Sequence, residues 1–141
     1  MKRFKFFHNI PPSFQKEKGK TYIAIVGGRN VDSFGFVEKK FLETIKEMEI
    51  EKEDVVIVSG GAKGVDSFAK KIALKHNIDI IEIIPLWSKY GKKAGLLRNH
   101  AIISLSDIVI AIPDKKSKGT WHSVKLARKQ GKKLVVELYK K

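Results

Sequence analysis

Residues 55–66 read VVIVSGGAKGVD, and this stretch passes from an apolar run through a glycine-rich loop into the start of a helical pattern. The run Val55–Val58 consists of four β-branched residues, which is typical of a strand buried on both faces. Gly60 and Gly61 end the run, and apolar residues then recur at helical spacing. The order of strand, loop and helix predicts one βα unit of a parallel sheet.

The same alternation continues on both sides of this stretch. Apolar runs that we interpret as strands occupy residues 22–26, 55–58, 78–84, 108–112 and 134–138. Amphipathic segments that we interpret as helices occupy residues 34–48, 65–76, 94–105 and 121–131. Because crossover connections are right-handed, we predict an α/β, three-layer Rossmann-like fold with a parallel sheet of about five strands in the order 3-2-1-4-5.

The first 19 residues lie outside this alternation. They are rich in basic and aromatic residues and are interrupted by Pro11 and Pro12. We therefore predict that residues 1–19 are an N-terminal extension and that residues 20–141 form a single Rossmann-like domain. We expect the extension to add little to the main core. Its phenylalanines would dock on the domain surface or on a neighbouring subunit, which leaves a homo-oligomer open.

The chain has a net charge of +14, and its two ends carry most of it. Residues 1–20 hold six basic and one acidic residue, and residues 114–141 hold ten basic and two acidic residues. Such ends attract nucleic acid, but lysine-rich surfaces also serve solubility, so charge leaves both explanations open. The chain contains no cysteine, no metal-ligand cluster and no apolar stretch of membrane-spanning length. We expect a cytoplasmic protein with no metal and no membrane contact.

Ligands of open parallel sheets bind outside the carboxyl ends of the strands. In this chain the loops that leave those ends are residues 27–30, 60–64, 85–93 and 113–120. In the first loop, Gly27 and Gly28 allow backbone amides to approach a ligand, and Arg29 could pair with a phosphate beside Asn30.

The second loop contains Gly60, Gly61, Ala62 and Gly64, and its amides would point at an anion near a helix N-terminus. The loop is neither a Walker A motif nor a G-x-G-x-x-G motif. Asp66 follows in the first helical turn, where it would either favour the helix dipole or contact a ribose.

The third and fourth loops add polar and aromatic candidates. Trp87 could stack on a base or cover the core, and Arg98 and Asn99 could reach the ligand or hold neighbouring loops. In the fourth loop, Gly119 and Thr120 could bind an anion at a helix start, with Thr120 as the N-cap. No catalytic set is identifiable, so the catalytic residues stay unknown and no cofactor is certain.

Four segments together resemble one family. They read IVGGRN (25–30), SGGAKGVDSFA (59–69), WSKYGKKAGLLRN (87–99) and KGTWHSVKLARKQGKKLVV (118–136). In order and spacing they resemble the YspA-like proteins of the SLOG superfamily, over residues 22–138. The resemblance implies a Rossmann-like fold that binds nucleotides or nucleotide-derived ligands as a sensor or an enzyme.

Two related groups define the alternatives. DNA-processing protein A has a loop similar to residues 59–69 and binds single-stranded DNA. The cytokinin-activating phosphoribohydrolases have a catalytic glutamate at the position of Ser123, which makes that activity doubtful here. We place a nucleotide-ligand-binding module first, a single-stranded nucleic-acid-binding protein second and an N-glycosidic hydrolase third. Because the loops contain few aromatic residues, we expect nucleic-acid binding to depend on charge alone and to be lost at moderate salt.

Overall fold

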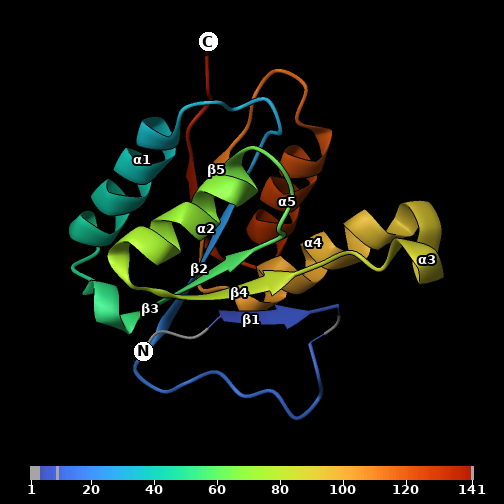
Figure 1. Cartoon of the computed structure of the whole chain (residues 1–141), viewed down its shortest axis with the longest axis horizontal. Coiled ribbons are helices and arrows are strands. Elements are labelled where there is room, and N and C mark those ends of the chain that lie inside the picture. The colour runs from blue at the N-terminus through green and yellow to red at the C-terminus, as the bar shows by residue number, and fades with distance from the viewer. Residues whose placement is uncertain (1–3, 9, 141) are drawn as a thin grey trace.

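The sheet of the computed structural model is parallel throughout and has six strands within the described residues, 4–8 and 10–140 (Figure 1). The strands are β1 (Phe4–Phe7), β2 (Thr21–Gly27), β3 (Val55–Ser59), β4 (Asp79–Ile83), β5 (Ile108–Ile112) and β6 (Lys133–Val136). Their order is β1-β4-β3-β2-β5-β6. The order predicted for the five central and C-terminal strands is therefore confirmed, and β1 is an additional strand at one edge.

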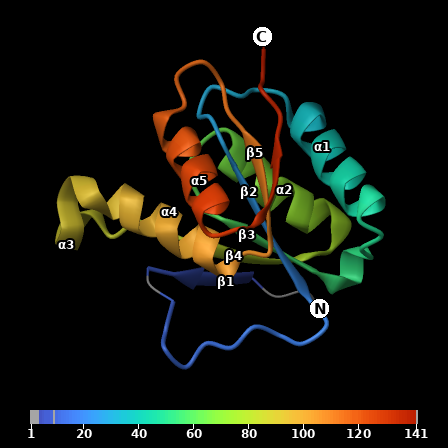
Figure 2. The ribbon, with the colours of Figure 1, turned by 180° about the vertical axis from the view of Figure 1, so that it is seen from behind.

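Helices cover both faces of the sheet, as the alternation predicts. The helices α1 (Phe34–Glu47) and α2 (Val65–His76) lie on one face, and α4 (Ala94–Leu105) and α5 (Lys118–Lys129) lie on the other (Figures 1 and 2). Three short helical segments are η1 (Lys52–Asp54), α3 (Trp87–Tyr90) and η2 (Gly91–Lys93). In both views α3 projects from the body of the molecule, beyond the N-terminal end of α4.

Alternating side chains of the strands form a separate core on each face of the sheet. Ile23 and Ile25 of β2 point into the core beneath α1 and α2. Ala24 and Val26 point into the core beneath α4 and α5. Burial of each large apolar side chain stabilises the fold by about 1.5–3 kcal/mol. Because both faces are covered, the strands are nearly continuous in Val and Ile rather than alternating with polar residues.

The N-terminal extension takes part in the sheet and packs against both cores, which corrects the expectation that it adds little to the main core. Phe4 pairs with Ile80 of β4, and the Ile84 amide donates to the Phe7 carbonyl at 2.7 Å. Phe4 packs against one core, and Phe7 and Phe14 pack against the other. The physical reason is the edge of β4, whose backbone groups would be unpaired without a neighbouring strand.

The last helix begins earlier than its apolar pattern indicates. The structure starts α5 at Lys118, with Ser117 at the N-cap position, and the Trp121 amide donates to the Ser117 carbonyl at 3.1 Å. Thr120 is therefore in the first turn, and its prediction as the N-cap is wrong. Trp121 is 45% exposed and does not belong to the buried stripe of the helix. Within the described residues, none of the helices combines the length and the apolar character needed to cross a membrane.

Candidate functional site

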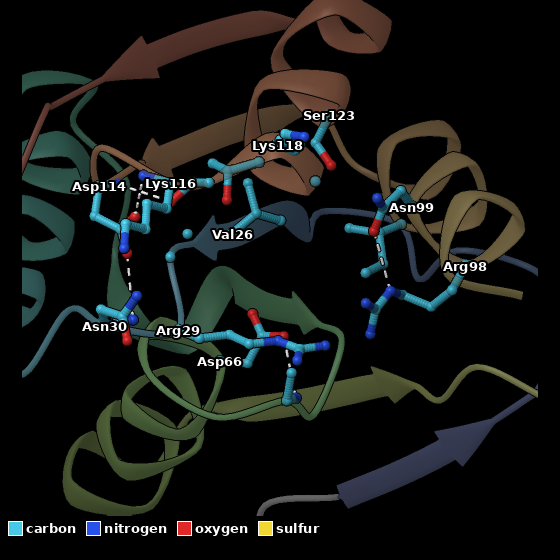
Figure 3. A pocket seen from close by; sticks show the side chains of 17 residues that line it. Val26, Arg29, Asn30, Asp66, Arg98, Asn99, Asp114, Lys116, Lys118 and Ser123 are labelled. Atoms are coloured by element: carbon cyan, nitrogen blue, oxygen red, sulfur yellow. Dashed lines mark hydrogen bonds between the residues drawn. The ribbon is translucent and has the colours of Figure 1, made fainter. Parts of the chain in front are cut away.

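The loops that leave β2, β3 and β5, the first turn of α5 and the second and third turns of α4 surround a pocket of about 370 Å³ (Figure 3). The pocket lies at the carboxyl ends of the central strands, where β2 is flanked by β3 and β5. In chain order, the crossover direction reverses between β2 and β5, which is the switch point where such sheets bind ligands. The site therefore lies where the strand order predicts it.

The first loop lies against α2 and the fourth loop so closely that it requires glycine. A Cβ atom on Gly27 would collide with the Val65 side chain and lie 2.5 Å from the Ile112 carbonyl oxygen. A Cβ atom on Gly28 would collide with the Asp114 carboxylate. The Gly28 amide also donates to the Ile112 carbonyl at 3.1 Å, so the loop continues the strand pairing into the site.

Asp114 holds the first and fourth loops together. Its buried carboxylate accepts the Asn30 amide at 3.2 Å and the Lys116 amide at 2.8 Å. Burial alone would raise the pKa of Asp114, but hydrogen bonds from Lys116, Ser117 and Asn30 outweigh it and lower the pKa below its ordinary value. The carboxylate is therefore ionised at neutral pH and serves to position the two loops. Asp114 lies in one of the loops that the sequence nominates, but it was not among the predicted site residues.

The first turn of α5 lines the pocket through Gly119 and Thr120. The first amides of a helix have no partner within the helix, so they are available to an anion and carry the positive end of the helix dipole. Lys116 and Lys118 line the same wall, and Ser123 lies one turn further into the helix (Figure 3). This wall can therefore neutralise a phosphate group.

The second loop reaches the pocket through Ala62 and Asp66. Asp66 is buried in the first turn of α2, and its carboxylate accepts the Ala62 amide at 3.1 Å. Burial raises the pKa of Asp66 to about 6, although the charge of Arg98 and the bond from Ala62 oppose this change. Gly64 precedes α2 with a φ of 74°, a conformation that side-chain-bearing residues rarely adopt.

Arg98 and Asn99 are polar residues of α4 that line the pocket. Arg98 Nη1 donates to the Gly60 carbonyl at 2.8 Å. Its Nε donates to Asn99 Oδ1 at 3.0 Å, as Figure 3 shows. Burial lowers the pKa of Arg98, but the nearby Asp66 opposes this, and an arginine remains charged at neutral pH. Arg98 thus holds the second loop, which is one of the two roles predicted for it, and it also lines the pocket; contact with a ligand stays a prediction.

Most of the residues proposed from the sequence surround this pocket. Those that line it are Gly27, Gly28, Arg29, Asn30, Ala62, Asp66, Arg98, Asn99, Gly119 and Thr120. The others are outside its lining and comprise Gly60, Gly61, Gly64 and Trp87. The lining residues that sequence analysis did not select are Val26, Ile102, Asp114, Lys116, Ser117, Lys118 and Ser123. Four of these lie in the fourth loop, whose run of lysines after a strand was the available signal.

The pocket offers binding groups but no recognisable catalytic set. Four cationic side chains line it together with two carboxylates: Arg29, Arg98, Lys116, Lys118, Asp66 and Asp114. In residues 4–8 and 10–140, no three His, Cys, Asp or Glu side chains are grouped to hold a metal ion. The arrangement is suited to recognising an anion through amides and fixed cations.

Replacement of Asp66 by asparagine is expected to remove a pH-dependent loss of stability. Because its pKa rises from 3.8 in the unfolded chain to about 6 in the folded protein, the folded state binds more protons between these values. Below about pH 4 the Asp66 carboxyl is protonated in the folded protein and does not lower the free energy of unfolding. As the pH rises through about 6 the buried carboxyl ionises, and the free energy of unfolding falls by about 3 kcal/mol. At pH 7 the D66N variant should therefore be more stable than the wild type.

Urea denaturation at pH 7, 5 and 4 measures this difference. The advantage of the asparagine variant should shrink as the pH falls, because the wild-type carboxyl then becomes protonated. An advantage that stays constant across this range would show that Asp66 is ionised without cost in the folded protein.

The sequence of the chain is similar to a known protein family. The family model described as DNA recombination-mediator protein A matches residues 13–89, which is more than half of the chain. The match includes the first two glycine-rich loops. The Gene 61 protein of Mycobacterium phage D29 is 35% identical over 83 residues, which cover 55% of this chain and 66% of the phage protein.

Two solved structures share the fold. DNA processing protein A from Helicobacter pylori, whose structure was determined to study its single-stranded DNA binding mode, matches with a TM-score of 0.63 and 28% identity over 84% of this chain. DNA processing protein A from Streptococcus pneumoniae matches with a TM-score of 0.64 and 22% identity over 83% of this chain. This chain spans 65% of the length of the first and 50% of the second. These matches support the Rossmann-like prediction, whereas the YspA-like subfamily is not confirmed.

Proposed function

Because the chain belongs to the DNA recombination-mediator protein A family, we propose that it binds single-stranded DNA at the pocket between the glycine-rich loops. A backbone phosphate would lie against the first turn of α5, and the pocket's arginines and lysines would neutralise it. The observation that carries the proposal is the convergence of four cationic side chains and a helix N-terminus on one pocket at the sheet's switch point. The family favours this function over the nucleotide-ligand module that the sequence placed first.

If a single strand binds at the pocket, its phosphates contact the pocket lysines; if it is attracted by net charge alone, any surface lysine contributes equally. A double replacement of Lys116 and Lys118 by alanine removes two pocket cations. A matched double replacement of Lys125 and Lys129 removes the same charge from exposed positions on α5 that do not line the pocket. Both variants change the net charge equally, so a difference between them reports the location of the strand.

We expect the pocket variant to bind a twelve-nucleotide single strand at least about tenfold more weakly than the wild type in 150 mM salt, since each hydrogen bond to a charged group contributes about 1.5–3 kcal/mol. Its dependence on salt should also weaken, by about 0.7 in the logarithmic slope for each phosphate that the variant no longer neutralises. Fluorescence anisotropy of a labelled strand measures both quantities. Equal reductions of affinity in the two double variants would indicate binding by overall charge and would contradict the proposal.

A mononucleotide is the second candidate ligand, and the size of the pocket favours it. A volume of about 370 Å³ falls in the range of small-molecule sites. Titration with a nucleoside 5′-monophosphate distinguishes the two candidates. If the mononucleotide binds as tightly as the twelve-nucleotide strand, the pocket is a ligand site and additional nucleotides contribute nothing.

A further inference from the structure

The pocket continues into an exposed aromatic surface along one face of α4. Arg98, Asn99 and Ile102 of this helix line the pocket. Gly95 precedes them by three, four and seven residues, so it lies on the same helix face, about one turn closer to the N-terminus. The pocket-lining face of α4 therefore extends past Gly95 toward α3.

The Trp87 ring covers this extension of the face. A Cβ atom on Gly95 would lie 3.3 Å from the end of the Trp87 ring, which is tighter than most real contacts. Glycine at position 95 thus leaves room for the indole to lie against the helix. This explains a glycine in a first helical turn, where it costs about 1 kcal/mol relative to alanine.

Trp87 is nonetheless 53% exposed, so this contact leaves more than half of its surface open to solvent. Three exposed lysines follow it within six residues, Lys89, Lys92 and Lys93. An aromatic surface beside cations is the combination that binds single strands, because bases stack on the ring and phosphates contact the lysines. A partner with acidic and planar groups therefore fits this surface by charge and by shape.

We propose that Trp87 is a base-stacking subsite outside the pocket, which takes a nucleotide adjacent to the one whose phosphate the pocket holds. This proposal replaces the expectation, drawn from the few aromatic residues in the loops, that strand binding depends on charge alone. This proposal rests on the proposed function, since it assigns a second contact to the same strand. The pocket is too small for a run of nucleotides, so a longer strand must leave it. The face of α4 that bears Gly95 offers one such path, and Trp87 lies on it.

The chain contains two tryptophans, which makes the subsite directly observable. Trp121 has a similar exposure of 45%, but it lies on α5 and does not line the pocket. In W121F the remaining indole is Trp87, and in W87F it is Trp121. Titration with a twelve-nucleotide thymidine strand in 200 mM salt should quench indole emission in W121F and leave it nearly unchanged in W87F.

Affinities complete the test. We expect W87A to bind the twelve-nucleotide strand about 5- to 150-fold more weakly than the wild type, which corresponds to the removal of one stacked base. The reduction should be smaller for a dinucleotide and smaller again in W87F, which keeps an aromatic ring. The matched variant W121A should bind within about twofold of the wild type.

The outcomes separate this proposal from the proposed function. Strand binding with quenching confined to Trp121, or with equal affinity in W87A, would overturn the stacking subsite and leave the pocket intact. No strand binding in the wild type would instead contradict the proposed function. Trp87 emission that depends on protein concentration without DNA would show that a second copy of the chain covers this surface, which also overturns the proposal.

Discussion

Replacement of Gly64 by alanine is expected to destabilise the protein by about 2–5 kcal/mol and to abolish binding at the pocket. Gly64 has a φ of 74° and a ψ of −128°, a backbone conformation that is strained for any residue with a side chain. A Cβ atom would also collide with the Gly28 carbonyl oxygen and lie 2.7 Å from the Arg29 Cα. These neighbours are backbone atoms, so they cannot move aside by rotating a side chain.

The substitution at Gly64 should also change the pocket, because Gly64 lies against Gly28 and Arg29 of the first loop. The Val65 amide donates to the Gly28 carbonyl at 3.3 Å, and this hydrogen bond sets the distance between the first loop and the start of α2. Any movement that relieves the collision therefore displaces Arg29 and Asn30, which line the pocket. Loss of binding at the pocket should therefore accompany the lower stability.

The matched control is the same substitution at Gly35, in the first turn of α1. A Cβ atom there would meet no described atom within 4 Å, and alanine favours a helix over glycine by up to about 1 kcal/mol. G35A should thus keep or raise the wild-type stability in urea denaturation, and it should bind the strand normally. Similar stabilities of the two alanine variants would mean that the close approach at Gly64 can relax without cost.

Replacement of Arg98 by alanine is expected to weaken single-strand binding by about 10- to 150-fold, the equivalent of one charge-assisted hydrogen bond. The guanidinium lines the pocket and is held in place by the Gly60 carbonyl and Asn99 Oδ1, so its remaining donors are oriented before a ligand arrives. Anisotropy of a labelled strand measures the change in affinity. R128A is the control, because it removes the same charge from an exposed position on α5.

The same substitution should lower stability by about 1–3 kcal/mol at pH 7. Without Arg98 the Gly60 carbonyl has no side-chain donor, and the buried Asp66 carboxylate is without the charge that opposes its raised pKa. Adding D66N to R98A removes the uncompensated carboxylate, so D66N should stabilise R98A by more than it stabilises the wild type. If the two changes simply add, Arg98 and Asp66 are not coupled and the electrostatic explanation is wrong.

The substitution G61D, which the glycine-rich loop suggests as a test of phosphate binding, is a poorer experiment than R98A. Gly61 has a φ of 69°, and a Cβ atom there would lie 2.6 Å from the end of the Ile84 side chain and 3.5 Å from the Glu82 carboxyl carbon. An aspartate would be strained and would repel Glu82 whether or not a ligand binds. Weaker binding of a ligand to G61D would therefore not distinguish a lost phosphate contact from a distorted loop.

The fold was predictable from the sequence because each signal is local and repeated. A buried parallel strand needs continuous apolar residues, and a covering helix needs an apolar stripe of helical period, so β2 to β6 and the long helices are evident without neighbours. Right-handed crossovers then leave few strand orders. The same logic located the loops of the site, because carboxyl ends of parallel strands meet at one edge.

The edge strand and the roles of individual side chains were not predictable in this way. Phe4–Phe7 forms a strand because β4 offers an unpaired edge, and nothing within the extension itself specifies that partner. Ser117 rather than Thr120 is the N-cap residue of α5, next to a turn at Asp114 whose carboxylate accepts amides from the first and fourth loops.

The amino-acid sequence by itself thus determined the layers, the order of the central strands and three of the loops that surround the site, since these follow from periodicity and from the conformational freedom of glycine. The predicted third loop, residues 85–93, does not line the pocket, and α4 takes its place there through Arg98, Asn99 and Ile102. Tertiary structure alone decided which groups meet there: Arg98 with the Gly60 carbonyl, Asp114 with Asn30, and the Trp87 ring with Gly95. The physical reason is that the first two contacts join residues 38 and 84 positions apart, and their geometry exists only after the sheet has brought those segments to one edge. The third contact depends on how the short segments between Trp87 and Ala94 turn the chain into α4.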